Sequence, residues 1–150
     1  EGLTPDLFEE CFLLAEKWCI EKNCEKMGFT HEKSAMRKAF DNFIALELEG
    51  LVVKIESGII GFSVFSRQSS RMCIVHFEKY APKVKGSGQV INWETAKKLR
   101  DRYEFINREE DMGIPGLRQA KRSYDPHLVN MTYSLVRLPT LKTHGKKTTG

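Results

Sequence analysis

The sequence predicts an α/β protein of the α+β kind, with a mixed antiparallel and parallel sheet flanked by helices. Three observations support this. Two segments with apolar residues at helical spacing open the chain, three β-rich runs follow them, and further helices and strands then alternate. The expected order is α-α-β-β-β-α-β-α-β. Because a helix separates the third strand from the fourth, the fourth must return by a crossover, which makes it parallel to its neighbour.

The opening 45 or so residues predict two helices. Thr4 is a suitable N-cap residue, and Pro5 is a suitable residue for the first helical position. The first helix is therefore expected over residues 5–23. The second is expected to begin near Thr30, where the sequence resembles a capping box with Lys33 in place of the usual Glu or Gln.

The next segment predicts an antiparallel meander. Residues 51–55 and 59–66 are β-rich runs joined by a short turn, in which Gly58 is expected to take a positive φ. A third run covers residues 72–80. Strict alternation in that run places His76 and Glu78 on one face, the solvent-facing one by our preferred interpretation.

The remaining elements alternate between helix and strand. A glycine-rich loop leads into a helix over residues 90–100, whose inward face is expected to hold Val90, Trp93, Ala96 and Leu99. A short strand over residues 103–107, a helix over 116–123 and a final strand over 128–138 complete the order.

Composition predicts one compact domain, residues 1–138, followed by a basic tail, residues 139–150, with the composition of a flexible segment. The chain has 150 residues, 41% of them hydrophobic, which is enough for a core. No run approaches the eighteen or so apolar residues of a membrane helix, so we expect a soluble, cytoplasmic protein. Since the sequence starts at Glu1 rather than Met, we expect a piece of a longer polypeptide.

The four cysteines form no C-x-x-C pair, so reduced thiols are expected and a metal site is not. The net charge is +4, and residues 112–150 hold seven basic side chains against one acidic. This asymmetry favours an anionic partner near that end, such as a phosphate group, RNA or an acidic lipid headgroup. The alternative is a solvated basic tail with no partner.

Two motifs carry a resemblance to known families. Lys83-Val84-Lys85-Gly86-Ser87-Gly88, between strand and helix, resembles the Q/R-x-x-G-x-G/A signature of the Gcn5-related N-acetyltransferase fold, with lysine in the first place. The segment FINREEDMGIPGLRQAKRSYDP, residues 105–126, resembles the N-R-E-x-D-x-G-I-x-G-L-R-x-A-K-x-S-Y-x-P signature of the DUF2156 family. That family is related to the C-terminal domain of phosphatidylglycerol lysyltransferases. Its members usually carry two tandem acetyltransferase-like halves, which implies that an N-terminal half is missing here.

The glycine loop suits a phosphate-bearing donor. Gly86 and Gly88 let the backbone approach a phosphate closely, and the following helix offers unpaired N–H groups and the positive end of its dipole. Lys83 and Lys85 add positive charge, and Ser87 lies between the glycines. The resemblance implies that this loop holds a pyrophosphate, while the donor's extended arm adds to the sheet as a strand. The alternative is an ordinary loop whose glycines serve the turn.

Acyl transfer needs a base for the nucleophile and an acid for the leaving group. Tyr124 is the candidate acid, because an unperturbed phenol has a pKa of about 10 and keeps its proton at neutral pH. Glu78 is the candidate base if its side chain faces the cleft. Glu109 joins the catalytic candidates because its carboxylate can bind an amino group of a substrate.

Four further residues are candidates for substrate binding: Asn107, Asp111, Arg118 and Lys121. Arg118 and Lys121 share one helical face with Arg122, which suits phosphate contact, although a solvated face is the common alternative. For Asp111 we favour a structural role, in which it caps the following turn or pairs with Arg118.

The resulting hypothesis is a transferase that moves an acyl or aminoacyl group from coenzyme A or aminoacyl-tRNA to an amine or hydroxyl acceptor, like phosphatidylglycerol lysyltransferases. The family resemblance favours the tRNA donor and the glycine loop favours coenzyme A. A rival hypothesis is a non-catalytic module that binds RNA, anionic lipid or a nucleotide ligand, because the sequence offers no unambiguous base.

Overall fold

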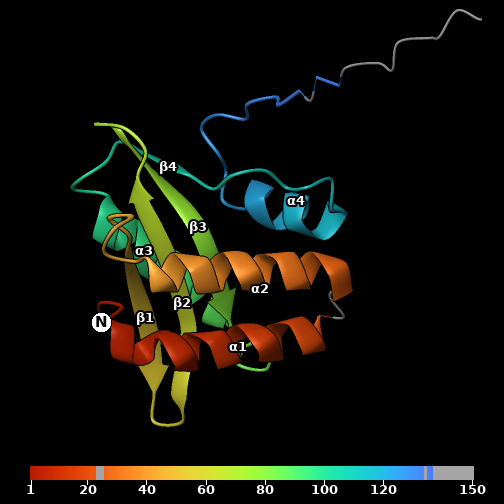
Figure 1. Cartoon of the computed structure of the whole chain (residues 1–150). Helices are drawn as coiled ribbons and strands as arrows, with labels where there is room; N and C mark the ends of the chain where they lie inside the picture. Colours follow the sequence, from red (N-terminus) through yellow and green to blue (C-terminus); the bar gives the residue numbers. More distant parts are fainter. Residues whose placement is uncertain (23–25, 134, 137–150) are drawn as a thin grey trace, which may run out of the picture. The chain divides into compact units, whose positions relative to one another are not determined.

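The computed structural model describes residues 1–22, 26–133 and 135–136 (Figure 1). The chain forms two compact units, Glu1–Glu110 and a second that begins at Asp111, each described by itself. The first holds a 3-10 helix η1 (Pro5–Leu7) and the elements α1 (Phe8–Glu21), α2 (Lys26–Asp41), β1 (Glu49–Ile55), β2 (Gly58–Arg67), β3 (Met72–Tyr80), α3 (Ser87–Leu99) and β4 (Phe105–Asn107). The second holds α4 (Pro115–Arg122).

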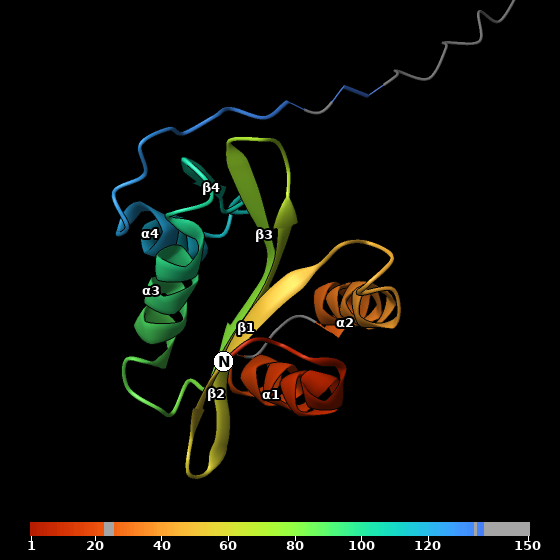
Figure 2. The same ribbon diagram turned by 90° about the vertical axis from the view of Figure 1, so that its left-hand side faces the viewer.

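The sheet of the first unit is mixed, as the sequence predicts. Its order is β1-β2-β3-β4, with antiparallel pairs β1–β2 and β2–β3 and a parallel pair β3–β4. Gly58, at the β1–β2 turn, has a φ of +113°, the conformation expected for a glycine there. Helices α1 and α2 cover one face of the sheet and α3 covers the other (Figure 2).

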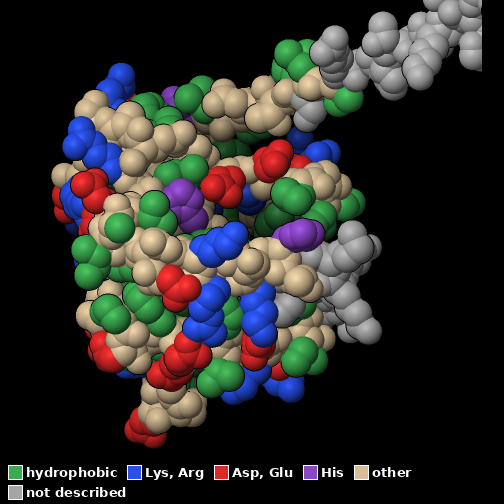
Figure 3. Space-filling model, in the orientation of Figure 1, with side chains coloured by type: hydrophobic (Ala, Val, Ile, Leu, Met, Phe, Trp, Pro, Cys, Tyr) green, Lys and Arg blue, Asp and Glu red, His purple; other side chains and the backbone are tan. Residues whose placement is uncertain are grey.

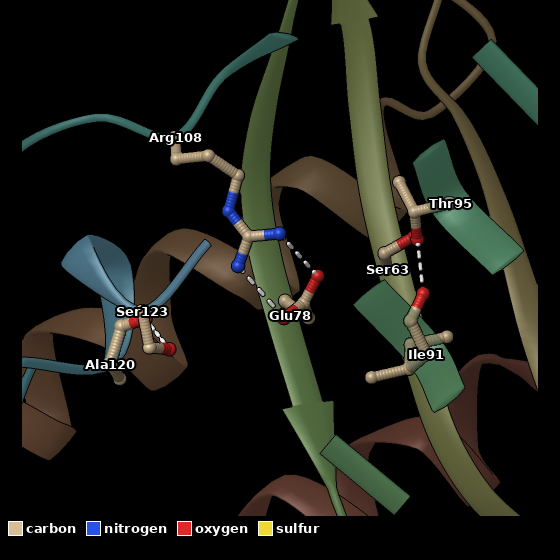
Figure 4. A network of polar contacts seen from close by, with 7 residues as sticks. All are labelled: Ser63, Glu78, Ile91, Thr95, Arg108, Ala120 and Ser123. Atoms are coloured by element: carbon tan, nitrogen blue, oxygen red, sulfur yellow. Dashed lines mark hydrogen bonds and ion pairs between the residues drawn. The ribbon is translucent and has the colours of Figure 1, made fainter. Parts of the chain in front are cut away.

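A separate apolar cluster fills each face of the sheet. Phe12, Phe40 and Phe62 belong to the cluster under α1 and α2. Phe65 and Ile91 belong to the cluster under α3. This second cluster adjoins a buried hydrogen bond of 2.7 Å between the hydroxyls of Ser63 and Thr95 (Figure 4). Each polar atom therefore has a partner in the apolar surroundings, as burial requires.

A β-bulge in β3 corrects the predicted alternation. Phe77 lies opposite Val64 and Val75 opposite Phe65, so His76 is an extra residue without a partner in the register. Val75 packs in the cluster under α3, whereas Phe77 packs against the cluster under α1 and α2. The two do not share a face, because the extra residue reverses the alternation of every side chain that follows.

The buried residues of α3 also differ from the predicted ones, except for Leu99. Ile91, Thr95 and Leu99 are its buried positions after the first turn. Trp93, predicted to face inward, is 68% exposed, and Val90 is 43% exposed. The prediction was wrong because the helix begins at Ser87 and packs with the polar Thr95 at the centre of its buried row, a position that a purely apolar pattern passes over.

Two further predictions differ from the structure. Helix α2 begins at Lys26, so Thr30 lies within the helix instead of capping it. The described residues of the predicted final strand, 128–133 and 135–136, have no regular secondary structure, and their large apolar side chains are exposed. A strand needs a hydrogen-bonded neighbour, and no strand in the described residues pairs with this segment. Residues 134, 137–138 and the predicted tail, 139–150, lie outside the described residues.

Among the described residues, no helix is both long and apolar enough to cross a membrane.

Candidate functional site

The strands β3 and β4 stay together over a very short distance. Their parallel register ends at Ile74 opposite Asn107, while β3 continues to Tyr80. No other strand in the described part of the chain pairs with β3 on that side. This part of β3 therefore has a backbone edge to which an extended ligand can add as a strand.

The loop that follows β3 leads into the N-terminus of α3. Gly86 is the N-cap, with a φ of +83° that favours glycine, and it offers no side chain to cap the helix. A Cβ on Gly88 would lie 3.2 Å from the ring carbons of Tyr80, so this position is packed closely. The Ser87 hydroxyl donates a hydrogen bond to the carbonyl of Ala81 at 2.7 Å and closes the loop.

These features leave the first turn of α3 without a side-chain cap, at the positive end of the helix dipole. Two lysines of the same loop bring cationic groups. Lys83 is largely exposed and its Nζ lies 3.3 Å from a carboxylate oxygen of Glu21, and Lys85 is exposed. The geometry is suited to an anion, and the predicted role of residues 83 and 85–88 in donor binding stays a prediction.

Arg108 connects the two strands where they separate. Its guanidinium donates to both carboxylate oxygens of Glu78, at 2.8 and 3.0 Å (Figure 4). The Glu78 side chain is only 13% exposed, so it does not belong to a solvent-facing row, and the β-bulge explains why. To act as a base, Glu78 would first have to release this guanidinium, because both of its carboxylate oxygens accept hydrogen bonds from Arg108. Its catalytic role stays a prediction.

The residues after β4 form a tight turn. The Asn107 side chain donates to Gln68 at 2.9 Å and accepts a hydrogen bond from the backbone N–H of Glu109 at 2.8 Å. Glu109 has a φ of +53°. One of its carboxylate oxygens lies 3.6 Å from Nδ1 of His76, and Nε2 of His76 lies 2.8 Å from the hydroxyl of Ser66. The structure thus brings Glu109 into a cluster that also contains Ser66 and His76.

The sequence did not indicate Ser66 as a candidate, and His76 was expected only to face the solvent. No motif contains them, and strict alternation assigns His76 to the solvent. The only signal is the histidine itself, since the bulge that places it beside Ser66 leaves no trace in the apolar period of β3.

The second unit holds the remaining predicted residues. Asp111 accepts a hydrogen bond from the N–H of Gly113 at 2.9 Å, and the Arg118 guanidinium donates to it at 2.5 and 3.1 Å. The guanidinium, followed by the Gly113 N–H, lowers the pKa of Asp111 to about 2. Asp111 therefore both caps the turn and pairs with Arg118, the structural role that we favoured.

Lys121 lies in the last turn of α4, and Tyr124, which follows the helix, is 46% exposed. The predicted roles of Tyr124, Lys121, Arg118 and Asn107 in catalysis or binding stay predictions.

Comparisons with known proteins agree with this architecture. A family model described as "Phosphatidylglycerol lysyltransferase, C-terminal" matches residues 1–136. No curated protein matches the chain. A conserved protein of unknown function from Bacteroides thetaiotaomicron VPI-5482 has a crystal structure that matches with 37% identity and a TM-score of 0.78. The match covers 86% of this chain and 44% of that protein, so this chain spans less than half its length.

More distant matches concern the fold alone. The ribosomal-protein-alanine N-acetyltransferase of Brucella melitensis biovar Abortus 2308 matches at 12% identity and a TM-score of 0.62, over 92% of this chain and 98% of that one. AAC(6')-Iy, solved in complex with the bisubstrate analog CoA-S-monomethyl-acetylneamine, matches at 10% identity and a TM-score of 0.61, over 93% and 96% of the two chains. The mixed sheet and these structural matches show that the chain has a Gcn5-related N-acetyltransferase fold. The match over residues 1–136 shows that it belongs to the phosphatidylglycerol lysyltransferase C-terminal family.

Proposed function

We propose that this chain transfers an acyl or aminoacyl group from a phosphate-bearing donor to an amine or hydroxyl acceptor. The observation that carries the proposal is the separation of β3 from β4 after Ile74: β3 continues without that partner to Tyr80, and the next loop places Gly86 at the N-terminus of α3. An unpaired strand edge and an uncapped helix start, joined by a short loop, suit a donor with a phosphate at one end and an extended arm.

Coenzyme A and aminoacyl-tRNA share this chemistry, because each carries an acyl group on a phosphate-bearing molecule. The loop with Lys83, Gly86 and Gly88 favours coenzyme A, and AAC(6')-Iy, of similar fold, was solved with a coenzyme A analog. The family description favours an aminoacyl donor. Since the matched Bacteroides protein is more than twice as long as the region that this chain covers, we propose that a second acetyltransferase-like half takes part.

Titration calorimetry with four ligands tests the proposal: coenzyme A, acetyl-coenzyme A, lysyl-tRNA and uncharged tRNA. We expect micromolar binding of one donor class that is lost in Gly88→Glu, because a carboxylate there repels phosphate and displaces the Tyr80 ring. Lys85→Glu is a second variant, since this exposed side chain can change without disturbing the core. Gly2→Glu is the matched control, because a Cβ at Gly2 has no atom within 4 Å.

The result that would contradict the proposal is binding by no donor and no turnover with any of them. RNA or anionic vesicles bound without transfer would then favour the non-catalytic module.

The predicted acid is tested by Tyr124→Phe, which removes only the phenolic oxygen. If Tyr124 protonates the leaving group, turnover should fall by roughly 10²–10⁴-fold with donor affinity unchanged. Tyr133→Phe, at another exposed tyrosine, is the control. Unchanged turnover in Tyr124→Phe would remove Tyr124 from the mechanism.

A further inference from the structure

Three consecutive strands bring a serine, a histidine and a glutamate together in the first unit. Ser66 lies near the end of β2, His76 is the extra residue of the bulge in β3, and Glu109 follows β4. Ser66 lies two residues after Val64, which packs under α1 and α2, and Phe77 after the bulge packs there as well. The cluster is therefore on the α1–α2 side of the sheet, opposite α3.

Both ring nitrogens of His76 face a partner of the appropriate kind. The Glu109 carboxylate lies 3.6 Å from Nδ1, and the Ser66 hydroxyl lies 2.8 Å from Nε2. A carboxylate beside Nδ1 favours the proton on that nitrogen, which leaves Nε2 as the acceptor of the serine proton. The order hydroxyl, imidazole, carboxylate is that of an activated nucleophile, its base and the group that orients the base.

The cluster is open enough to react. The side chains of His76 and Glu109 are 30% and 46% exposed, and Ser66 is half-buried. An acyl donor can therefore reach the hydroxyl. Asn107 helps to position Glu109. Its side-chain oxygen accepts a hydrogen bond from the backbone N–H of Glu109, which stabilises the left-handed conformation of that residue.

The cluster also lies where an extended donor arm would end. β3 and β4 separate at Ile74, two residues before His76. From His76 to Tyr80, just before the loop that leads into α3, β3 covers about 13 Å, at roughly 3.3 Å per residue. A donor whose phosphate lies at the start of α3, and whose arm follows the open edge of β3, would bring its carbonyl to the level of His76.

We propose that Ser66 is a nucleophile that accepts the acyl group as an ester before it passes to the acceptor. The proposal rests on the proposed function for the donor. The Ser66 oxygen forms a bond to the acyl carbon while Nε2 of His76 takes the serine proton. The bond from the acyl carbon to the donor's sulfur or oxygen breaks, and that atom takes the proton from His76, so this route does not need the phenol of Tyr124 as its acid. The acceptor then gives its proton to His76 and attacks the ester carbon. The bond from that carbon to the Ser66 oxygen breaks, and His76 gives the proton to Ser66, which leaves as the hydroxyl.

The test uses p-nitrophenyl acetate and a fluorophosphonate, which need neither coenzyme A nor tRNA. We expect the intact chain to gain the mass of one acetyl or one phosphonyl group, mapped to Ser66 by peptide mass spectrometry. Ser66→Ala should abolish the modification, and His76→Gln should slow it at least a hundredfold. Glu109→Gln should slow it less, because the base remains. Ser70→Ala, at an exposed serine of the β2–β3 turn, is the control and should react like the wild type.

Circular dichroism checks that each variant folds, and Ser66→Cys provides a second route. A thiol at this position should form the thioester, so acylation at residue 66 should persist in Ser66→Cys and again depend on His76. An unmodified Ser66 in the wild type, or equal rates in wild type and His76→Gln, would overturn the proposal.

The outcomes for donor binding and for Ser66 are separable. If p-nitrophenyl acetate acylates Ser66 but no donor binds in calorimetry, the role of Ser66 as a nucleophile is supported and the proposed donor is wrong. If Ser66→Ala still turns over a bound donor, Ser66 is not the nucleophile, and the proposed transferase activity is supported.

Discussion

The two units of this chain differ in how their residues are held. In Glu1–Glu110, apolar side chains fill both faces of the sheet, and Phe62 and Val64 are fully buried. In the unit that begins at Asp111, helix α4 has no buried residue, and Met131 and Tyr133 are exposed. The family signature nevertheless runs through both. A dense motif therefore does not mark a core, because recognition and packing place different demands on a side chain.

The two units also differ in charge, and the space-filling view shows one face of the first unit (Figure 3). Over α1 and α2, Lys and Arg side chains alternate with Asp and Glu (Figure 3). Glu32, for example, lies 2.7 Å from Nζ of Lys79, whose side chain is buried and lies over the Trp18 ring. Residues 1–110 hold 17 Lys and Arg against 18 Asp and Glu, so the charge of this unit is nearly balanced, whereas residues 112–150 carry a marked basic excess.

The largest expected effect is on stability and separates the two units directly. Phe62→Ala removes a fully buried ring and should lower the free energy of unfolding by about 3–5 kcal/mol. Met131→Ala, at a side chain that is 74% exposed, should change it by less than about 0.5 kcal/mol. Urea denaturation followed by circular dichroism measures both. Equal losses would mean that Met131 is buried in solution and that the contrast between the units is wrong.

Two glycines sharpen the comparison at the backbone. A Cβ on Gly50 would lie 2.6 Å from the carbonyl oxygen of Ser63, so Gly50→Ala should cost about 1–3 kcal/mol of unfolding free energy. In α4, a Cβ on Gly116 meets nothing within 4 Å, and Gly116→Ala should stabilise that helix by up to about 1 kcal/mol.

Denaturation measures the Gly50 variant, and amide hydrogen exchange across residues 115–122 measures the Gly116 variant. Lower protection of α4 in Gly116→Ala would show that this glycine contacts something that a methyl group disturbs.

The smallest effect concerns pH and the Asp111–Arg118 pair. Because the folded pKa of Asp111 is lowered to about 2, the stabilisation is fully present above the unfolded value near 4. It should be lost as the pH falls from about 4 to about 2. NMR chemical shifts of Gly113 and Arg118 should report this transition. Asp111→Asn should abolish it, and a midpoint near 4 in the wild type would show that the pair does not form.

Local signals explain which parts of the fold were predictable. The hairpin with Gly58, the bounds of the strand Met72–Tyr80 and the glycine-rich entry to α3 were predicted correctly, because turn residues and β-rich runs act over a few neighbours. On the inward face of α3, Leu99 was predicted correctly but Thr95 was missed, since Thr95 is buried only because Ser63 and the Ile91 carbonyl satisfy its hydroxyl. The described residues of the predicted final strand, 128–133 and 135–136, also have no regular secondary structure, because an apolar alternation specifies a strand only where another strand is available to pair with it.

The candidate site divides in the same way. The sequence by itself determined the family, the mixed sheet, the turn that joins Asp111 to Arg118 and the loop with Gly86 and Gly88, all of which depend on neighbours in the chain. Only the tertiary structure decided that Arg108 pairs with Glu78 and that Ser66, His76 and Glu109 meet. These contacts depend on the one extra residue in β3 and on a parallel crossover, and neither the bulge nor the register of β3 and β4 can be inferred from apolar periodicity.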